Sequence, residues 1–142
     1  MTETGLSPQE SSDLRRVASL MVPASAEYNV PGADDPKIFA DIEKSIGRDM
    51  GEIREALAAL TGIAEMDGAK AMAVAETFRS KGGATVAAVE RCVLQCYYRD
   101  DRVVISLGLE ARPPFPKGYT LEQGDWSLLD PVRARKKMWR DA

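Results

Sequence analysis

The feature that most constrains the fold is a change of character within the stretch from Ala88 to Trp126. Its first half carries apolar residues at steps of three and four, the periodicity of a buried helix. Its second half cannot be helical, because prolines remove backbone N–H donors and fix φ, and glycines follow them. These residues are Val89, Val93, Cys96 and Tyr97 in the first half and Pro113, Pro114, Pro116, Gly118 and Gly124 in the second. The sequence therefore predicts a helical body followed by an extended arm.

The predicted arm carries large apolar side chains and has too few neighbours of its own to bury them. They are Phe115, Tyr119, Leu121 and Trp126. Such side chains must lie on the chain's own helical body or on another protein. We expect the second, with aromatic residues as anchors, since aromatic residues usually dominate interface energetics. Folding back over the body is the alternative.

Chain length and composition favour one helical domain. The 142 residues are enough for one core. Aromatic residues make up only 6% and gather in the last third, so the body must be packed mainly by aliphatic residues, which favours closely packed helices. We predict an all-α fold, a small bundle of about five helices over residues 11–110. A disordered N-terminus over residues 1–10 precedes it, and the proline-rich arm over residues 111–142 follows.

Apolar periodicity and capping residues place these helices. The first begins near Ser11 to Asp13, whose side chains can cap it, and ends before Pro23. The others run from Pro36 to near Gly47, from near Met50 to Gly62, from Ala69 to Arg79, and from a cap at Thr85 to a break at Arg99-Asp100-Asp101. The apolar run from Val103 to Leu109 is either helical or strand-like.

The absence of histidine excludes several classes of functional site. Histidine is the commonest general acid or base and the commonest metal ligand, so its absence excludes most nucleophilic catalytic arrangements and most zinc sites. The net charge of −3 gives no reason to expect nucleic-acid binding. No segment approaches the roughly 20 apolar residues that span a bilayer, so we expect no membrane insertion. No catalytic, cofactor-binding or metal-binding residue is predicted.

Two groups of residues superficially suggest metal sites. Cys92 and Cys96 stand four apart on one helical face, but a tetrahedral site needs further soft ligands and a disulfide within one helical turn would be strained. We interpret them as small core residues. Five carboxylates lack the spacing of a calcium loop and are interpreted as a solvated acidic face. They are Asp34, Asp35, Asp41, Glu43 and Asp49.

Three segments of the chain resemble one protein family: LRRVASLMVPAS, CYYRDDRVVISLGLEARPPFPKGY and GDWSLLDPVRAR. They are similar to the gluconate 2-dehydrogenase subunit 3 family, and the resemblance extends over about residues 13 to 135. It is strongest at Tyr97-Tyr98, the RDDRV that follows, Leu107-Gly108, and the proline-rich run to Gly118-Tyr119. Members are small helical subunits that accompany FAD-dependent oxidoreductases of the glucose-methanol-choline type.

The resemblance implies a non-catalytic role. In such complexes the large subunit holds the flavin and the histidine-based site that oxidises alcohols, while the small subunit supports assembly or stability. This sequence has no Gly-x-Gly-x-x-Gly turn behind a strand and no histidine, so it supplies neither the dinucleotide fold nor the base. FAD would lie in the large partner subunit, which acts on sugars or other alcohols, and the two chains would form a heterodimer or a higher heteromer.

Eight residues are predicted to contact this partner: Tyr98, Arg112, Phe115, Tyr119, Trp126, Arg133, Arg135 and Trp139. The resemblance also bears on location, because many family members carry a twin-arginine export signal. Arg15-Arg16 and the apolar run after it mimic one, but the six residues from Val17 to Val22 are fewer than the roughly 7–15 that such a signal needs. A cytoplasmic location is expected, or a periplasmic one if a leader was removed or the partner carries one.

Two other functions stay open. The chain is alternatively a free-standing helical regulatory or binding module, homodimeric through the same arm. It is alternatively a small enzyme that uses Tyr97 or Tyr98 with Asp100 as acid and base. Adjacent tyrosines on a helix point about 100° apart, so only one of them can face a common site. A neighbouring gene for a large dinucleotide-binding protein would favour the accessory subunit, and an isolated gene would favour the module.

Overall fold

The computed structural model describes residues 5–111 and 122–136, which belong to two compact units, Met1–Ala111 and Arg112–Ala142. Within those described ranges there are seven α-helices and no strand. The predicted all-α fold is therefore confirmed, with seven helices where about five were expected. The additional helices are α6, which resolves the ambiguous run after Asp100, and α7, which lies within the predicted arm.

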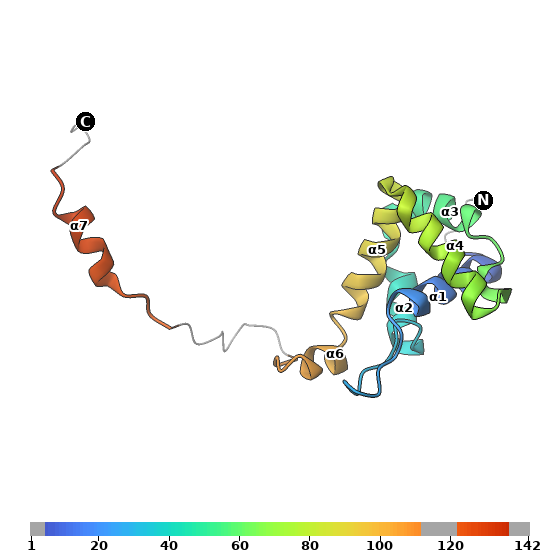
Figure 1. The fold of residues 1–142 in the computed structure, drawn as a ribbon, viewed down its shortest axis with the longest axis horizontal. Helices are drawn as coiled ribbons and strands as arrows, with labels where there is room; N and C mark the ends of the chain where they lie inside the picture. The colour runs from blue at the N-terminus through green and yellow to red at the C-terminus, as the bar shows by residue number, and fades with distance from the viewer. Residues whose placement is uncertain (1–4, 112–121, 137–142) are drawn as a thin grey trace. The chain divides into compact units, whose positions relative to one another are not determined.

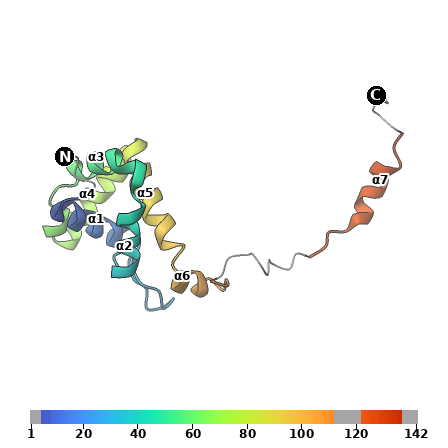
Figure 2. The ribbon, with the colours of Figure 1, turned by 180° about the vertical axis from the view of Figure 1, so that it is seen from behind.

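Unit 1 is a bundle in which α5 is the central helix. Its helices are α1 (Pro8–Met21), α2 (Pro36–Ser45), α3 (Met50–Ala59), α4 (Gly68–Lys81), α5 (Gly83–Tyr97) and α6 (Asp101–Ser106), with 3-10 turns η1 (Gly47–Asp49) and η2 (Ile63–Glu65). Helix α5 packs against α2, α3 and α4, while α1 lies against α3, α4 and η2. Both views show α2 beside α5, with α6 and the loop before α2 at one end of the bundle (Figure 1, Figure 2).

The core of unit 1 is aliphatic, as the low aromatic content predicts. Apolar residues are buried on α1, α2, α3 and α5, and among the described residues the only aromatic side chains buried in the core are those of Phe39 and Tyr97. Fully buried aliphatic residues include Leu14, Ile38, Ile42, Ile46, Ile53, Ile63 and Val93. Burial of one such side chain contributes about 1.5–3 kcal/mol to folding, so these faces determine how the helices associate.

Helix α1 begins earlier than predicted. Ser7 caps it through a reciprocal pair of hydrogen bonds: its hydroxyl accepts the N–H of Glu10 (3.2 Å), and its own N–H donates to the Glu10 carboxylate (2.7 Å). Pro8 occupies the first turn, where no N–H is needed. The start expected near Ser11 to Asp13 is therefore wrong, and the disorder predicted over residues 1–10 is wrong for the part that lies in α1.

Asp13 does not cap α1 but joins it to the chain after α3. Its side chain is buried, and its carboxylate accepts the N–H groups of Gly62 (3.0 Å) and Ala64 (2.9 Å). Gly62 has φ of +79°, a conformation that glycine adopts without steric cost, and this presents both N–H groups to the carboxylate. Because a buried carboxylate needs partners, this contact sets how α1 lies against η2.

The boundary between α4 and α5 is a glycine pair. Helix α5 begins at Gly83, with Gly82 as its N-cap residue at φ +62°. The cap predicted at Thr85 is therefore wrong. Glycine can take a positive φ that a side chain would resist, so α5 follows α4 with a single residue between them.

Unit 2 contains a short helical segment where an extended arm was predicted. It consists of the 3-10 turn η3 (Trp126–Leu129) followed by α7 (Asp130–Arg133). Asp125 starts it by accepting the N–H (3.0 Å) and hydroxyl (2.6 Å) of Ser127. Pro131 lies in the first turn of α7, where proline is tolerated. The prediction of a wholly extended arm is therefore wrong for this segment, and the proline-rich run lies outside the described residues.

Candidate partner-binding surface

The helical segment of unit 2 carries an apolar stripe. Trp126 and Leu129 are three residues apart in η3, where side chains at that spacing eclipse one another, and Val132 continues the same spacing into α7. All three side chains are exposed, and neither η3 nor α7 contains a buried residue. We call Trp126, Leu129 and Val132 the unit 2 stripe. It is the kind of apolar surface that protein interfaces cover.

Basic residues accompany the unit 2 stripe. Arg133 lies 3.6 Å from the Asp130 carboxylate, an exposed pair that contributes little stability. Arg135 is exposed and follows α7. Both are able to pair with carboxylates at the rim of a partner surface, where such charges affect association rate more than affinity.

The eight predicted contact residues are distributed unevenly over the structure. Trp126, Arg133 and Arg135 belong to the described part of unit 2, and Tyr98 belongs to unit 1. The other four, Arg112, Phe115, Tyr119 and Trp139, lie outside the described residues. The local helix therefore brings together Trp126 and Arg133 with two residues that sequence reasoning did not select, Leu129 and Val132. Their three-residue spacing was the signal that could have identified them.

Tyr97 and Tyr98 have opposite environments. Tyr97 is buried in the core, and this burial raises the pKa of its hydroxyl. Tyr98 is exposed at the end of α5 and meets the Tyr97 ring edge to face, with 5.2 Å between ring centroids. Such aromatic pairs typically contribute about 0.5–1.5 kcal/mol beyond their burial. Tyr97 is thus a core residue, and Tyr98 is available for contact.

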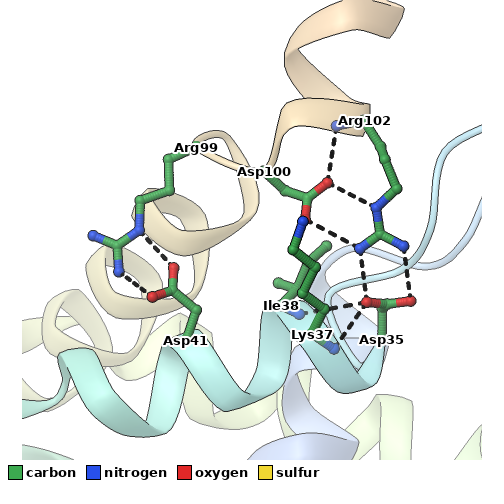
Figure 3. A network of polar contacts seen from close by, with 7 residues as sticks. All are labelled: Asp35, Lys37, Ile38, Asp41, Arg99, Asp100 and Arg102. Atoms are coloured by element: carbon green, nitrogen blue, oxygen red, sulfur yellow. Dashed lines mark hydrogen bonds and ion pairs between the residues drawn. The ribbon is translucent and has the colours of Figure 1, made fainter. Parts of the chain in front are cut away.

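The arginine Arg102 connects α6 to the start of α2 (Figure 3). Its guanidinium binds Asp100 through Nε (2.9 Å) and Nη2 (3.1 Å), and binds Asp35 through Nη2 (2.8 Å) and Nη1 (3.2 Å). Hydrogen bonds from this guanidinium lower the pKa of both carboxyl groups and raise the pKa of Arg102. Asp100 is buried and also accepts the N–H of Arg102, which starts α6.

A second arginine, Arg99, joins the end of α5 to the middle of α2 (Figure 3). Its guanidinium forms a two-pronged pair with the Asp41 carboxylate, at 2.7 Å for Nη2, and also donates to the Ser45 hydroxyl. The hydrogen bonds from Arg99 hold the pKa of Asp41 below its usual value. Bidentate pairs between a guanidinium and a carboxylate add geometric specificity to the attraction between the charges. Helix α2 therefore determines the direction in which the chain leaves α5.

The acidic residues near α2 are not simply a solvated face. Asp35 and Asp41 pair with Arg102 and Arg99, and Asp49 accepts a 2.8 Å contact from Arg91. The interpretation as a solvated face is wrong for these three, because arginines from α5, from α6 and from the turn between them lie opposite the three carboxylates. No metal-binding group of three or more acidic or cysteine side chains occurs in residues 5–111 or 122–136.

The two cysteines are core residues, as predicted. Both are free thiols and both are buried on α5. Burial raises the pKa of Cys92 to about 11 and also raises the pKa of Cys96. Since the thiolate is the reactive form, burial and the raised pKa values disfavour reaction of these thiols at neutral pH.

An apolar groove of about 320 Å³ lies between α1, α4 and α5, and the sequence did not predict it. Its lining includes Met21, Met72 and Leu94. At its rim Arg79 and Glu90 pair with each other at 3.8 Å. The groove therefore offers apolar contacts with a neutralised pair at its edge.

Comparisons of the chain with protein-family models, with curated proteins and with solved structures find no match. None of the helices in the described ranges combines the length and the apolar character that a bilayer span requires. The family resemblance rests on the three sequence segments, and one of these, Gly124 to Arg135, contains the whole unit 2 stripe.

Proposed function

We propose that this chain is a non-catalytic accessory subunit that binds a large FAD-dependent oxidoreductase of the glucose-methanol-choline type through its C-terminal unit. The observation that carries the proposal is the exposed unit 2 stripe of Trp126, Leu129 and Val132. Helices shorter than about 12–15 residues are marginal alone in water, and the segment Trp126–Arg133 is shorter than that. A partner surface would supply the burial that the stripe lacks.

The class of partner follows from sequence resemblance. The segment GDWSLLDPVRAR is both one of the segments that resemble the gluconate 2-dehydrogenase subunit 3 family and the segment that holds the stripe. One stretch of chain thus carries part of the resemblance and the whole unit 2 stripe. The partner would supply FAD and the histidine base, since this chain contains no histidine.

The chemistry of unit 1 supports a structural role. An enzyme built on Tyr97 or Tyr98 with Asp100 would need the Asp100 carboxylate free to accept a proton. Arg102 occupies that carboxylate and lowers its pKa, which makes it a weaker base. Burial removes Tyr97 from solvent and raises the pKa of its hydroxyl. Both features favour the accessory subunit over the small enzyme.

Co-purification tests the proposal. The chain is expressed alone and together with the large reading frame beside its gene, and each sample is analysed by affinity purification, size-exclusion chromatography and visible absorption. We expect a larger protein to co-elute in fixed ratio, with flavin absorption near roughly 450 nm contributed by the partner's cofactor. A stable, colourless chain that does not co-elute with the large protein would refute the proposal. A homodimer of the chain alone would instead support the regulatory module.

A matched pair of variants tests the stripe itself. Trp126→Ala removes an aromatic anchor, and such residues typically cost about 2 kcal/mol or more when truncated, which is about a thirtyfold loss of affinity. Leu128→Ala is the control, because Leu128 is 74% exposed but lies off the stripe. We expect it to bind within about twofold of the parent chain, since peripheral contacts are nearly neutral. Equal losses for both variants would argue against a defined stripe.

A further inference from the structure

The C-terminal end of unit 1 exposes an unusual concentration of large apolar side chains. Tyr98, Ile105, Leu107 and Leu109 are 55%, 61%, 58% and 61% exposed. They are four of the seven exposed large apolar residues in the described part of unit 1, and all four fall within residues 98–109. We call these four residues the α6 surface. Single apolar residues are ordinary on a protein surface, but four exposed ones within residues 98–109 make this end of unit 1 a candidate contact site.

The leucines of the α6 surface are held by an ordered helix end. The N–H of Leu109 bonds to the carbonyl of Val104 (3.2 Å), and the N–H of Gly108 bonds to the carbonyl of Ile105 (2.9 Å). This pair of bonds, with Gly108 at φ +75°, is the Schellman motif that ends many helices. The backbone that carries Leu107 and Leu109 is therefore held in place by hydrogen bonds.

The helix beneath the surface is anchored to the bundle. Val103 is buried in the core, and Arg102 ties α6 to Asp35 at the start of α2. Arg99 ties the residues just before α6 to Asp41 (Figure 3). A backbone held in this way loses little conformational freedom on binding, which favours a preorganised docking surface.

Chain connectivity limits how far a protein bound to unit 2 can lie from this surface. The ten residues between Ala111 and Glu122 can span at most about 40 Å, since each residue extends the chain by at most about 3.6 Å. Any protein that holds the unit 2 stripe is thereby kept within reach of the α6 surface. Such tethering raises the local concentration of the second contact and can strengthen the whole interaction by about 10²–10⁴ without a tighter single contact.

We infer that the α6 surface is a second docking surface for the same oxidoreductase subunit, which meets it with an apolar patch poor in charge. This inference rests on the proposed function, because it takes the occupant of the unit 2 stripe as its partner. The accessory subunit then contacts its partner through two surfaces, the α6 surface on the helical bundle and the unit 2 stripe.

Binding measurements on full-length variants test the inference. Ile105→Ser/Leu109→Ser alters the α6 surface, Trp126→Ala alters the unit 2 stripe, and Met72→Ser is the control, an exposed apolar residue in the groove. We expect the α6 double variant to bind the isolated large subunit at least about tenfold more weakly than the parent chain. The control should bind as the parent does. Circular dichroism verifies that each variant remains folded.

Native hydrogen exchange provides a readout that needs no substitution. Formation of the complex should slow exchange of the amides of Leu107, Gly108 and Leu109. If the parent chain binds the large subunit but the α6 variant binds equally well and these amides are unchanged, the inference is overturned while the proposed function stands. If the parent chain does not bind the large subunit, the proposed function itself is overturned. If the α6 variant abolishes self-association of the chain instead, the surface is a homodimer contact and the inference is likewise overturned.

Discussion

Replacement of Arg102 by methionine removes the contact that fixes α6 while keeping much of its apolar stem. The Asp100 side chain is 4% exposed, and hydrogen bonds to a charged group typically contribute about 1.5–3 kcal/mol. The pair with Asp35 is more exposed and adds only about 0.5 kcal/mol. Because Arg102 is itself 43% exposed, water recovers part of the loss, so we expect α6 docking to weaken by about 2–3 kcal/mol.

This loss should appear first as local opening of α6, because that helix lies at one end of the bundle and contributes only Val103 to the core. A change of 2–3 kcal/mol corresponds to a rate increase of about 30- to 150-fold for amide exchange governed by that opening. Native-state hydrogen exchange at the Val104 and Leu107 amides, which bond to carbonyls of the same helical region, measures it directly. Global unfolding should be affected less than this local opening, so the midpoint of thermal unfolding should fall only slightly.

Two further variants make the test specific. Arg102→Lys retains the charge but cannot bridge two carboxylates with a planar fork, so it should restore less than half of the lost protection. Arg48→Met is the matched control, because the Arg48 side chain is 92% exposed and its ion pair with Asp49 spans 4.0 Å. It should change exchange at α6 by less than about twofold. If Arg102→Met also leaves exchange at α6 within threefold of the parent, the reasoning about the bridge is refuted.

Three other outcomes are expected. Asp13→Ala leaves the partly buried N–H groups of Gly62 and Ala64 without their acceptor and should lower the free energy of unfolding by about 2 kcal/mol, measured by urea denaturation; a loss below about 0.5 kcal/mol would contradict this. Asp35 and Asp100 have lowered pKa values in the folded chain. The stability that their ionised carboxylates contribute is therefore complete above the ordinary pKa of 3.8 and is lost as the pH falls through the lowered values. Exchange at α6, followed from pH 6 down to pH 2 after correction for intrinsic rates, should therefore accelerate only below about pH 4, and acceleration near pH 6 would refute this assignment. Cys92 and Cys96 should resist iodoacetamide at pH 8 in the folded chain and react in denaturant, as counted by mass spectrometry, whereas rapid labelling of the native protein would show that they are not buried.

The features predicted correctly from the sequence are those that depend on residues close together in the chain. The apolar faces of α2 and α3 follow directly from helical spacing, and so does the burial of Cys92 and Cys96. Errors arose where a competing local signal was overlooked. The start of α1 was placed too late because the cap formed by Ser7 and Glu10 was overlooked, and the segment after Asp125 was assigned as extended because the prolines and glycines before it were extrapolated too far.

The pairing of distant charges was beyond sequence reasoning. Arg99 and Asp41 are separated by 58 residues, and Arg102 and Asp35 by 67. Nothing in local spacing selects those carboxylates from the other acids near α2. Their choice depends on how α5 packs against α2, which is set by burial over the whole bundle.

The sequence by itself determined the helical class, the aliphatic core faces and the inert cysteines, because periodicity and burial act over one or two helical turns. The tertiary structure decided which carboxylates the arginines bind and which leucines after α6 stay exposed. Those outcomes depend on the relative placement of helices that are far apart along the chain. Propensity and spacing report local conformation, whereas exposure and ion pairing are properties of the packed bundle.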